Sequence, residues 1–316
     1  MIVKYLARAV AIVADNMGRH VYISNSKDKT ISQSAAGTGS TLSALTPATV
    51  TTGQSPGAMA IDSRDRYLYA INKYDATISG YLISSTGTLT AIFPAVAAGT
   101  GPSSIAINPT GTFLYTANFG GGDPSGGSLS QYFIGQDGVL SALSPGAVAA
   151  GNAWNSIGVD VSGKFAYAVN SENRTVAEFS IRTDGGLAAA ASSPPTITGN
   201  FPGQLFFGAG GQSLYALSNL GVDVDTGYIA QFVISNGGAP QTNTPASLQV
   251  SSGMAVESLA FIGTFAYALS AFNIYNIGGS ITQYTASSTG ALSAVGTASP
   301  ANINPIAMIM IAAHLH

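Results

Sequence analysis

Six tyrosines recur along the chain in nearly the same local sequence and at an almost constant interval. Each follows a short apolar run and a turn, as in the stretch 104–115. The tyrosines lie 46 to 52 residues apart and are Tyr22, Tyr69, Tyr115, Tyr167, Tyr215 and Tyr267. A period of this length, with short apolar stretches between glycine turns, is typical of repeats that each form one small β-sheet. The spacing therefore predicts an all-β fold, a β-propeller in which every repeat forms one four-stranded blade.

The four strands of a repeat can be read from its alternation of apolar and polar residues. The second strand carries the tyrosine, and the third alternates with period two, as in 77–81 and 128–132, which is expected where one face of a strand is packed. The fourth begins near a leucine in four copies, which are Leu89, Leu140, Leu187 and Leu292. An asparagine follows the tyrosine by three residues in the first four copies, and we interpret it as a turn residue that tolerates left-handed backbone.

Six complete repeats fill most of the chain. They span about 8–53, 54–99, 100–151, 152–199, 200–253 and 254–301. Residues 302–316 resemble the first strand of a seventh unit, so we expect a partial seventh blade formed by this segment and residues 1–7. The whole chain, 1–316, is then a single propeller domain. Alternatively the terminal strand pairs with another subunit, with Ile306, Met308 and Met310 as the residues that mediate assembly.

The charge content limits the classes of partner. Charged residues make up 8% of the chain, against roughly 25% in typical soluble proteins. A net charge of −3 provides no basic surface for nucleic acid, and there is no cysteine. The most apolar run, 306–313, is far shorter than the ~20 residues that a membrane-spanning helix needs. We therefore expect no nucleic-acid partner and no membrane span. The weakly charged composition favours an extracellular, cell-surface or periplasmic location.

The sequence PSSIAINPTG at 102–111, followed by FLYTAN at 113–118, resembles the lactonase-like and YVTN-type β-propeller repeats. The resemblance covers about 300 residues. It implies a propeller fold, and relatives with this repeat include sugar-lactone hydrolases, muconate-cyclising enzymes and surface proteins. In the enzymatic relatives, a Gly-Pro-Arg-His-like sequence opens one first strand, and an Asn-Glu pair follows a tyrosine strand. These residues supply cationic and acid/base groups in the central pocket of the relatives.

The corresponding positions differ here. The strand openings at 153–156 and 201–204 contain no Arg or His, and Glu172 stands one residue further from Asn170 than the family pattern has it. A shift of one residue in a strand reverses the side-chain direction. We therefore assign no catalytic residue.

Three residues are candidates for ligand binding at the mouth of the predicted channel. Trp154 and Glu257 stand where first strands begin, and Glu172 follows the fourth tyrosine strand. A carboxylate there can orient a ligand, and an indole can stack on a sugar or another flat group. The alternative is that Trp154 packs between blades and that the carboxylate of Glu257 is solvated.

A cation site is conceivable in one loop. Asp223 and Asp225 alternate before Gly227, a pattern that can contribute to Ca²⁺ binding, although a full site needs six or more oxygen ligands. The alternative is a solvated acidic loop. No other cofactor is predicted.

These observations give two functional hypotheses. The first is a non-enzymatic extracellular or periplasmic propeller that serves as a structural or interaction module and self-assembles through its terminal strands or binds another surface protein. The second is a lactonase-like hydrolase, or a small-molecule binder, that uses the central channel. We favour the first because the family's catalytic residues are missing at the aligned positions.

Overall fold

The computed structural model describes most of the chain as β-strands joined by turns. The described residues are 9–37, 41–121, 126–148, 153–190, 194–197, 202–208, 210–218, 226–252, 255–271, 279–296 and 299–301. Within these ranges there is no helix with the length and apolar character needed to cross a membrane. The described residues group into two compact units. Unit 1 comprises the residues up to Trp154 together with Thr183–Gly186, and unit 2 comprises Asn155–Arg182 and the residues from Leu187 onwards.

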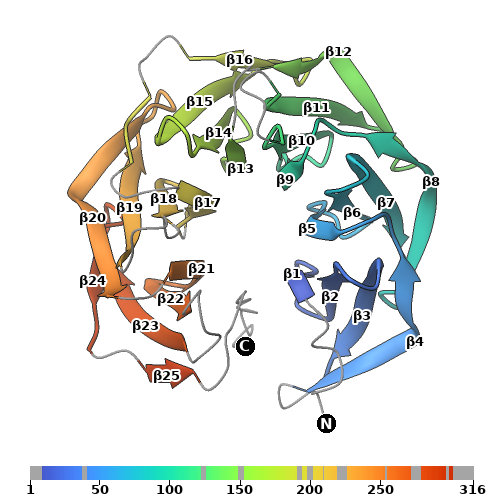
Figure 1. Ribbon diagram of the computed structural model, residues 1–316, viewed down its shortest axis with the longest axis horizontal. Helices are drawn as coiled ribbons and strands as arrows, with labels where there is room; N and C mark the ends of the chain where they lie inside the picture. Colours follow the sequence, from blue (N-terminus) through green and yellow to red (C-terminus); the bar gives the residue numbers. More distant parts are fainter. Residues whose placement is uncertain are drawn as a thin grey trace. The chain divides into compact units, whose positions relative to one another are not determined.

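Three four-stranded sheets make up most of unit 1, and each is one blade (Figure 1). Blade 1 consists of β1 (Ala9–Ala14), β2 (His20–Asn25), β3 (Thr30–Ala36) and β4 (Leu42–Thr51). Blade 2 consists of β5 (Pro56–Ile61), β6 (Tyr67–Asn72), β7 (Thr77–Ile83) and β8 (Leu89–Ala97). Blade 3 consists of β9 (Pro102–Ile107), β10 (Phe113–Asn118), β11 (Ser128–Ile134) and β12 (Leu140–Val148). In each sheet the strands pair in chain order and antiparallel.

Three further sheets follow along the chain, and they belong to unit 2 apart from Trp154. Blade 4 consists of β13 (Trp154–Val159), β14 (Phe165–Asn170), β15 (Thr175–Ile181) and β16 (Leu187–Ala189). Blade 5 consists of β17 (Pro202–Phe207), β18 (Ser213–Ser218), β19 (Thr226–Ile234) and β20 (Pro240–Ser252). Blade 6 consists of β21 (Ala255–Ile262), β22 (Phe265–Ala271), β23 (Gly279–Ala286) and β24 (Leu292–Ala294), and β25 (Ser299–Ala301) also pairs with β23.

The hydrophobic core lies between consecutive blades. Between blades 1 and 2, Tyr22 and Ile31 pack against Leu68 and Tyr81, and all four side chains are fully buried or nearly so. Corresponding clusters fill the spaces between blades 2 and 3, blades 4 and 5, and blades 5 and 6. A strand that is apolar on both faces can pack in this way only if another sheet covers each face. The burial of every residue of β6 agrees with this requirement.

Five of the six recurring tyrosines also join one blade to the next through a hydrogen bond. In each case the tyrosine hydroxyl donates to the carbonyl oxygen of a glycine in the turn between the third and fourth strands of the following blade. The pairs are Tyr22–Gly87, Tyr69–Gly138, Tyr115–Gly185, Tyr167–Gly238 and Tyr215–Gly290, at 2.5 to 2.8 Å. The tyrosine is therefore both a core residue and a specific contact between blades.

Glutamine forms a second contact in blades 1, 3 and 5. Gln33, opposite Tyr22 on the neighbouring strand, donates from Nε2 to the carbonyl oxygen of Pro47 at 2.7 Å and accepts at Oε1 from the backbone N–H of Leu89 at 2.8 Å. Pro47 lies in an irregular stretch of β4, and Leu89 opens the fourth strand of blade 2. Gln131 and Gln231 donate to Pro145 and Pro245 in the same way.

In the first three blades the recurring asparagine does not act as the turn residue that the sequence suggested. Asn25, Asn72 and Asn118 are the last residues of their strands, and none has a positive φ. In each, the side-chain amide donates to two hydroxyls of the third strand. A buried amide needs such partners, so the asparagine fixes the start of the third strand instead of bending the chain.

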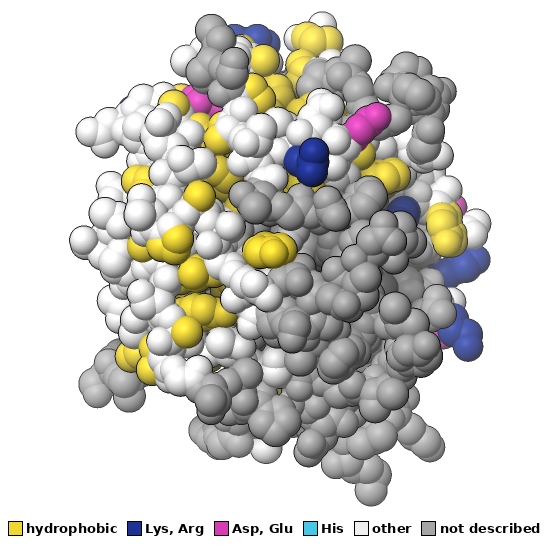
Figure 2. Space-filling view, turned by 60° about the vertical axis from the view of Figure 1, so that its left-hand side comes forward, with side chains coloured by type: hydrophobic (Ala, Val, Ile, Leu, Met, Phe, Trp, Pro, Cys, Tyr) yellow, Lys and Arg dark blue, Asp and Glu magenta, His cyan; other side chains and the backbone are white. Residues whose placement is uncertain are grey.

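The surface is poor in charge and its edges are protected. On the side seen in Figure 2, the few charged side chains are well separated among polar and apolar atoms. The fourth strand forms the exposed edge of each blade. A proline lies within this strand in four blades, as Pro47, Pro94, Pro145 and Pro245. Because proline removes a backbone donor from an edge strand, these residues limit pairing with other strands.

The prediction of an all-β propeller of four-stranded blades is confirmed, with six blades described. The segments assigned to a partial seventh blade, 302–316 and 1–7, lie outside the described residues. The assignment of 1–316 to a single domain stays a prediction.

Candidate functional site

The first strand of each blade is where a propeller presents side chains to its central channel. In blades 3 to 6 these strands are β9, β13, β17 and β21, and two candidate residues lie at their openings. Trp154 is the first residue of β13, and Glu257 is the third residue of β21.

A β-bulge marks the opening of the first strand in several blades. In β9, Pro102 pairs with Asn118 and Ser104 with Ala117, so that Ser103 between them has no partner across the ladder. In β21, the corresponding shift lies between Val256 and Ser258 and leaves Glu257 as the extra residue. A bulge changes the direction of its extra side chain relative to a regular strand. Glu257 thus occupies in blade 6 the position that Ser103 occupies in blade 3.

Polar side chains at two of these openings contact the next first strand along the chain. The hydroxyl of Ser103 lies 2.8 Å from the carbonyl oxygen of Trp154 and 3.0 Å from that of Ala117. In blade 4, Asn155 follows the opening residue and donates from Nδ2 to the carbonyl oxygen of Pro202 at 3.1 Å. These polar side chains are donors to backbone carbonyls. An ionised carboxylate at this position cannot donate, so Glu257 has a different role.

The environment of Glu257 alters its acidity. The side chain is half-buried between Val256 and Ser258, both of which are buried. Burial raises the pKa of the Glu257 carboxyl above its ordinary value, because water stabilises the charged form less well there. Within the described part of the chain no Lys, Arg or His forms an ion pair with it. A carboxyl of this kind can take up or release a proton closer to neutral pH than an exposed glutamate can.

The other two candidate residues lie in different settings. Only 7% of the surface of Trp154 is exposed, so that its indole offers little area for stacking on a ligand. Glu172 is exposed in the turn between β14 and β15, where Asn170 Oδ1 accepts from the backbone N–H of Asn173. Glu172 therefore lies outside the first strands.

The candidate metal and assembly residues cannot be placed. Asp223 and Asp225, and likewise Ile306, Met308 and Met310, lie outside the described residues. Among the residues that are described, no group of three or more His, Cys, Asp or Glu side chains is arranged to hold a metal ion. The Ca²⁺ site and the pairing of terminal strands both stay predictions.

Sequence reasoning did not identify the second residue of these openings as a recurring position. Aligned on their openings, the first strands read Pro-Ser at 102–103, Trp-Asn at 154–155, Pro-Gly at 202–203 and Val-Glu at 256–257. One variable residue beside an apolar opening residue is the signal that could have identified Ser103 and Asn155.

A second carboxyl was also missed. Glu178 in β15 lies opposite Tyr167 on β14, and burial raises its pKa.

Solved structures with the same fold include lactonases. A protein of Bacteroides fragilis provisionally described as a 6-phosphogluconolactonase matches with a TM-score of 0.74 and 20% identity, over 94% of this chain and 85% of its own. The periplasmic gluconolactonase of Pseudomonas aeruginosa matches with a TM-score of 0.67 and 15% identity, over 92% and 86%. A protein of unknown function from Desulfotomaculum acetoxidans matches with 0.68 and 14%, over 94% and 89%. No curated protein sequence matches. At these identities the likeness shows the fold alone.

A family model gives a more specific result. The model described as "Lactonase, 7-bladed beta-propeller" matches residues 20–152 and 84–199. Together the two matches run from residue 20 to residue 199, which is more than half of the 316-residue chain. The resemblance drawn from the repeats is confirmed. The expectation of a non-enzymatic structural module was wrong, since it treated the absence of Arg and His at two strand openings as the absence of a lactonase. The chain belongs to the lactonase family of seven-bladed β-propellers.

Proposed function

We propose that the protein is a lactonase-like hydrolase that opens an uncharged sugar lactone. In this proposal Glu257 is the general acid–base group that accepts a proton from water and returns it to the ring oxygen. The observation that carries the proposal is the half-buried carboxyl at the bulge of β21, whose pKa burial raises, in a chain of the lactonase family. The lactonases among the solved structures with this fold support the choice of reaction class.

The chemistry needs one group that moves a proton in each of two steps. Water adds to the lactone carbonyl carbon while its proton passes to the ionised carboxylate of Glu257. The bond from this carbon to the ring oxygen then breaks, and the carboxyl returns the proton to that oxygen. The products are the hydroxy acid and the regenerated carboxylate. A carboxyl with a raised pKa suits both steps, because its pKa lies closer to neutral pH than that of an exposed glutamate.

We expect an uncharged substrate because cationic side chains are absent from the described first strands. The described first strands contain neither Lys nor Arg. Phosphate groups are usually bound by such residues or by helix N-termini, and the net charge of −3 opposes anions further. Glucono-1,5-lactone is therefore a better candidate than its 6-phosphate. As part of the same proposal we place the protein outside the cytosol, in keeping with its low charge content.

The test is the rate of hydrolysis of glucono-1,5-lactone, corrected for spontaneous opening. Replacement of Glu257 by Gln should lower kcat by about 10²–10⁴-fold, the usual contribution of a general acid–base group. Glu178→Gln is the matched control, because it neutralises another carboxyl with a raised pKa that lies in a third strand. It should leave kcat unchanged. Equal rates for Glu257→Gln and the wild type would overturn the role of Glu257. A wild-type rate no higher than the spontaneous rate for both lactones would overturn the proposed function.

A further inference from the structure

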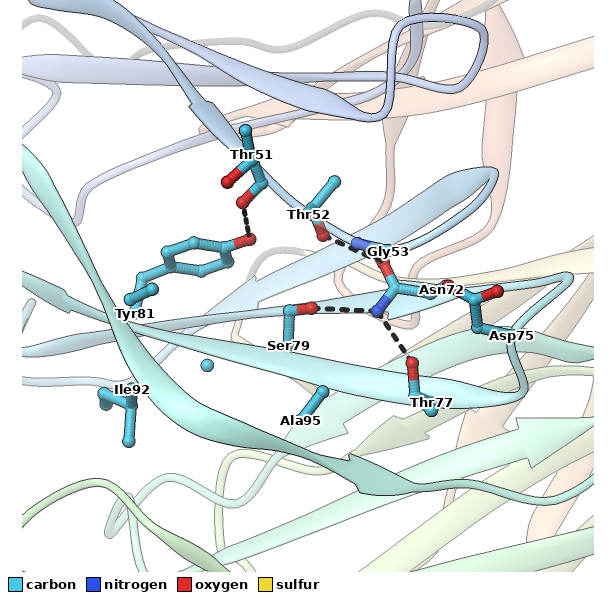
Figure 3. A pocket seen from close by; sticks show the side chains of 12 residues that line it. Thr51, Thr52, Gly53, Asn72, Asp75, Thr77, Ser79, Tyr81, Ile92 and Ala95 are labelled. Carbon is cyan, nitrogen blue, oxygen red and sulfur yellow. Dashed lines mark hydrogen bonds between the residues drawn. The ribbon is translucent and has the colours of Figure 1, made fainter.

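A pocket of about 330 Å³ lies in unit 1, lined by residues of blade 2 and of the segment that leads into it from blade 1 (Figure 3). Its walls come from the end of β4 and the turn after it, from the turn between β6 and β7, and from the middle of β7 and β8. The volume is at the lower end of the roughly 300–1,000 Å³ found for small-molecule sites. It is large enough for one small ligand.

The pocket occurs where blade 2 departs from its neighbours. Gly80 lies opposite Tyr69, as Gln33 lies opposite Tyr22 in blade 1. Gln33 ties the third strand to the irregular stretch of the fourth by its bond to Pro47, whereas a glycine has no side chain to make this bond.

The neighbouring stretch of β8 follows a different path as well. Gly80 pairs with Ile92 and Ile78 with Val96, so three residues of β8 stand against the single residue Ser79. Because no side chain at position 80 bonds β7 to this stretch of β8, there is room for a pocket on the side of β7 that carries Ser79.

One end of the pocket is polar and rigid. Asn72 Oδ1 accepts from Thr52 Oγ1 at 2.9 Å and from the backbone N–H of Gly53 at 3.1 Å, and its Nδ2 donates to Thr77 Oγ1 and Ser79 Oγ, both at 2.9 Å (Figure 3). All four hydrogen-bonding positions of this carboxamide are thus in use. Asn72 fixes the surrounding groups and is not itself free to bind a ligand.

Two of the fixed groups keep hydrogen-bonding capacity. Thr77 Oγ1 accepts from Asn72, so its own hydroxyl hydrogen remains to be donated, and the described residues include no recorded acceptor for it. Asp75 uses Oδ2 to accept from the backbone N–H of Gln54 at 2.6 Å, and no described residue is recorded as a donor to Oδ1. The polar end therefore presents one donor, on Thr77 at the start of β7, and one carboxylate acceptor, on Asp75 in the turn before it.

The opposite wall is apolar. Tyr81 lies behind this wall as a fully buried ring, and its hydroxyl donates to the carbonyl oxygen of Thr51 at 2.7 Å. Ile92 and Ala95 form this wall along β8 (Figure 3). A ligand that fits must combine a donor and an acceptor at one end with a C–H surface at the other.

We propose that this pocket binds a small neutral sugar or polyol through two hydroxyls on adjacent carbons. One hydroxyl donates to the Asp75 carboxylate and its neighbour accepts from Thr77, while the carbon skeleton lies against Ile92 and Ala95. A sugar has polar edges and an apolar face, which suits a pocket with polar groups at one end and aliphatic side chains at the other. The pocket shares no residue with the proposed hydrolytic site, and its proposal does not depend on that site.

The experiment measures binding of D-glucose and D-mannose by saturation-transfer NMR and calorimetry, with tetrahydropyran as a ring that lacks hydroxyls. We expect saturable binding of at least one sugar and none of tetrahydropyran. Asp75→Asn keeps an oxygen for the N–H of Gln54 but removes the charge, and Ala95→Leu extends an exposed side chain over the pocket. Each should weaken binding by about tenfold or more.

Two controls separate the outcomes. Asp137→Asn changes another exposed turn aspartate that caps a backbone N–H, that of Val139, and should leave affinity unchanged. Glu257→Gln should also leave it unchanged, so that failure of the hydrolase proposal is distinguishable from failure of this one. No saturable binding of either sugar would overturn the proposal. Binding that survives both Asp75→Asn and Ala95→Leu in folded protein would overturn it too, because the sugar would then be bound elsewhere.

Discussion

The hydroxyl of Tyr69 in blade 2 donates to the carbonyl oxygen of Gly138 in blade 3 at 2.8 Å, in a fully buried setting. Tyr69 comes from the second strand of its blade and Gly138 from the turn before the fourth strand of the next. Beside this bond, Tyr67 donates to the carbonyl oxygen of Gln136 in the same turn at 2.5 Å. Burial raises the pKa of the Tyr69 hydroxyl, so it stays a neutral donor. The hydroxyl is thus available as a donor at and well above neutral pH.

The first prediction removes this bond. Tyr69→Phe keeps the buried ring but leaves the carbonyl of Gly138 without its donor in a dry environment. We expect the free energy of unfolding to fall by about 1–3 kcal/mol, the usual cost of an unsatisfied buried polar group. Urea unfolding followed by circular dichroism measures the change. Tyr74→Phe is the control, because Tyr74 is 78% exposed and should shift the midpoint by almost nothing. Equal, small shifts for both variants would show that the hydroxyl of Tyr69 contributes no net stability.

The second prediction concerns the turn that receives the tyrosine. Gly138 has a φ of +79°, and a Cβ added to it would lie 2.6 Å from the ring of Tyr67. Gly138→Ala therefore combines an unfavourable backbone conformation with a clash against a packed ring, and should lower stability by about 3 kcal/mol or more. Gly263→Ala is matched for the first effect alone, since its φ is +56° and no atom lies within 4 Å of the added Cβ.

Gly263→Ala should cost roughly 1–2 kcal/mol, the backbone contribution by itself. The difference between the two variants measures the close packing of the ring on the turn. If both glycines could be replaced at the same cost, the packing of Tyr67 against Gly138 would be unimportant for stability.

The fold was predictable because its determinants are local. The tyrosine interval and the period-two pattern of the third strands indicate sheets of known size, and β8, β12, β16 and β24 begin at the four leucines expected. The contact of Tyr69 with Gly138 was not predictable in the same way, because it joins residues 69 positions apart that meet only after the blades pack. The asparagine was misread for a related reason, since a polar residue at the end of a strand looks like a turn residue until its partners are known.

The candidate site was less predictable than the fold. Glu257 was found by its position, but its raised pKa depends on its burial in the folded protein, and its direction depends on a bulge that the strand pattern does not reveal. The pocket beside Gly80 arises from a missing side chain, which leaves no motif in a sequence. The functional hypothesis failed because it compared only two strand openings and the position of Glu172 with the family pattern. Membership of the family is carried by the repeat as a whole.

The third prediction tests the glutamine contact between blades 1 and 2. In Gln33→Glu, an ionised carboxylate would face the carbonyl oxygen of Pro47, so that a donor is replaced by a second acceptor. Stability near neutral pH should fall by about 1–3 kcal/mol. At acidic pH the protonated carboxyl can donate to Pro47 and still accept from Leu89, and part of the loss should be recovered. Gln136→Glu, in an exposed turn, is the control and should show neither effect. A pH-independent loss in Gln33→Glu would contradict the proposed donor role of Nε2.

The acidity of Glu257 makes stability depend on pH in a defined direction. Burial raises the pKa of its carboxyl in the folded protein above the value of about 4.3 typical of an unfolded chain. The folded state therefore holds the proton more tightly than the unfolded state does. The stabilising effect of the proton is complete below the unfolded pKa, and it is lost as the pH rises through the raised folded pKa. Above that value the protein retains a partly desolvated charge.

The fourth prediction follows from the direction in which the Glu257 carboxyl makes stability change with pH. Glu257→Gln keeps a neutral side chain of the same shape at every pH, so it should unfold at a higher temperature than the wild type at about pH 8 and at nearly the same temperature at about pH 4. Thermal unfolding of both proteins across this range measures the difference. Glu172→Gln, in an exposed turn, should follow the wild-type curve throughout. A wild type that unfolds at a higher temperature than Glu257→Gln at about pH 8, with the difference vanishing toward pH 4, would mean that the carboxylate is stabilised by a partner in the folded protein, and the desolvated site described here would be wrong. Together with the activity of the same variant, this curve separates a carboxyl that is destabilising but catalytic from one that is merely buried.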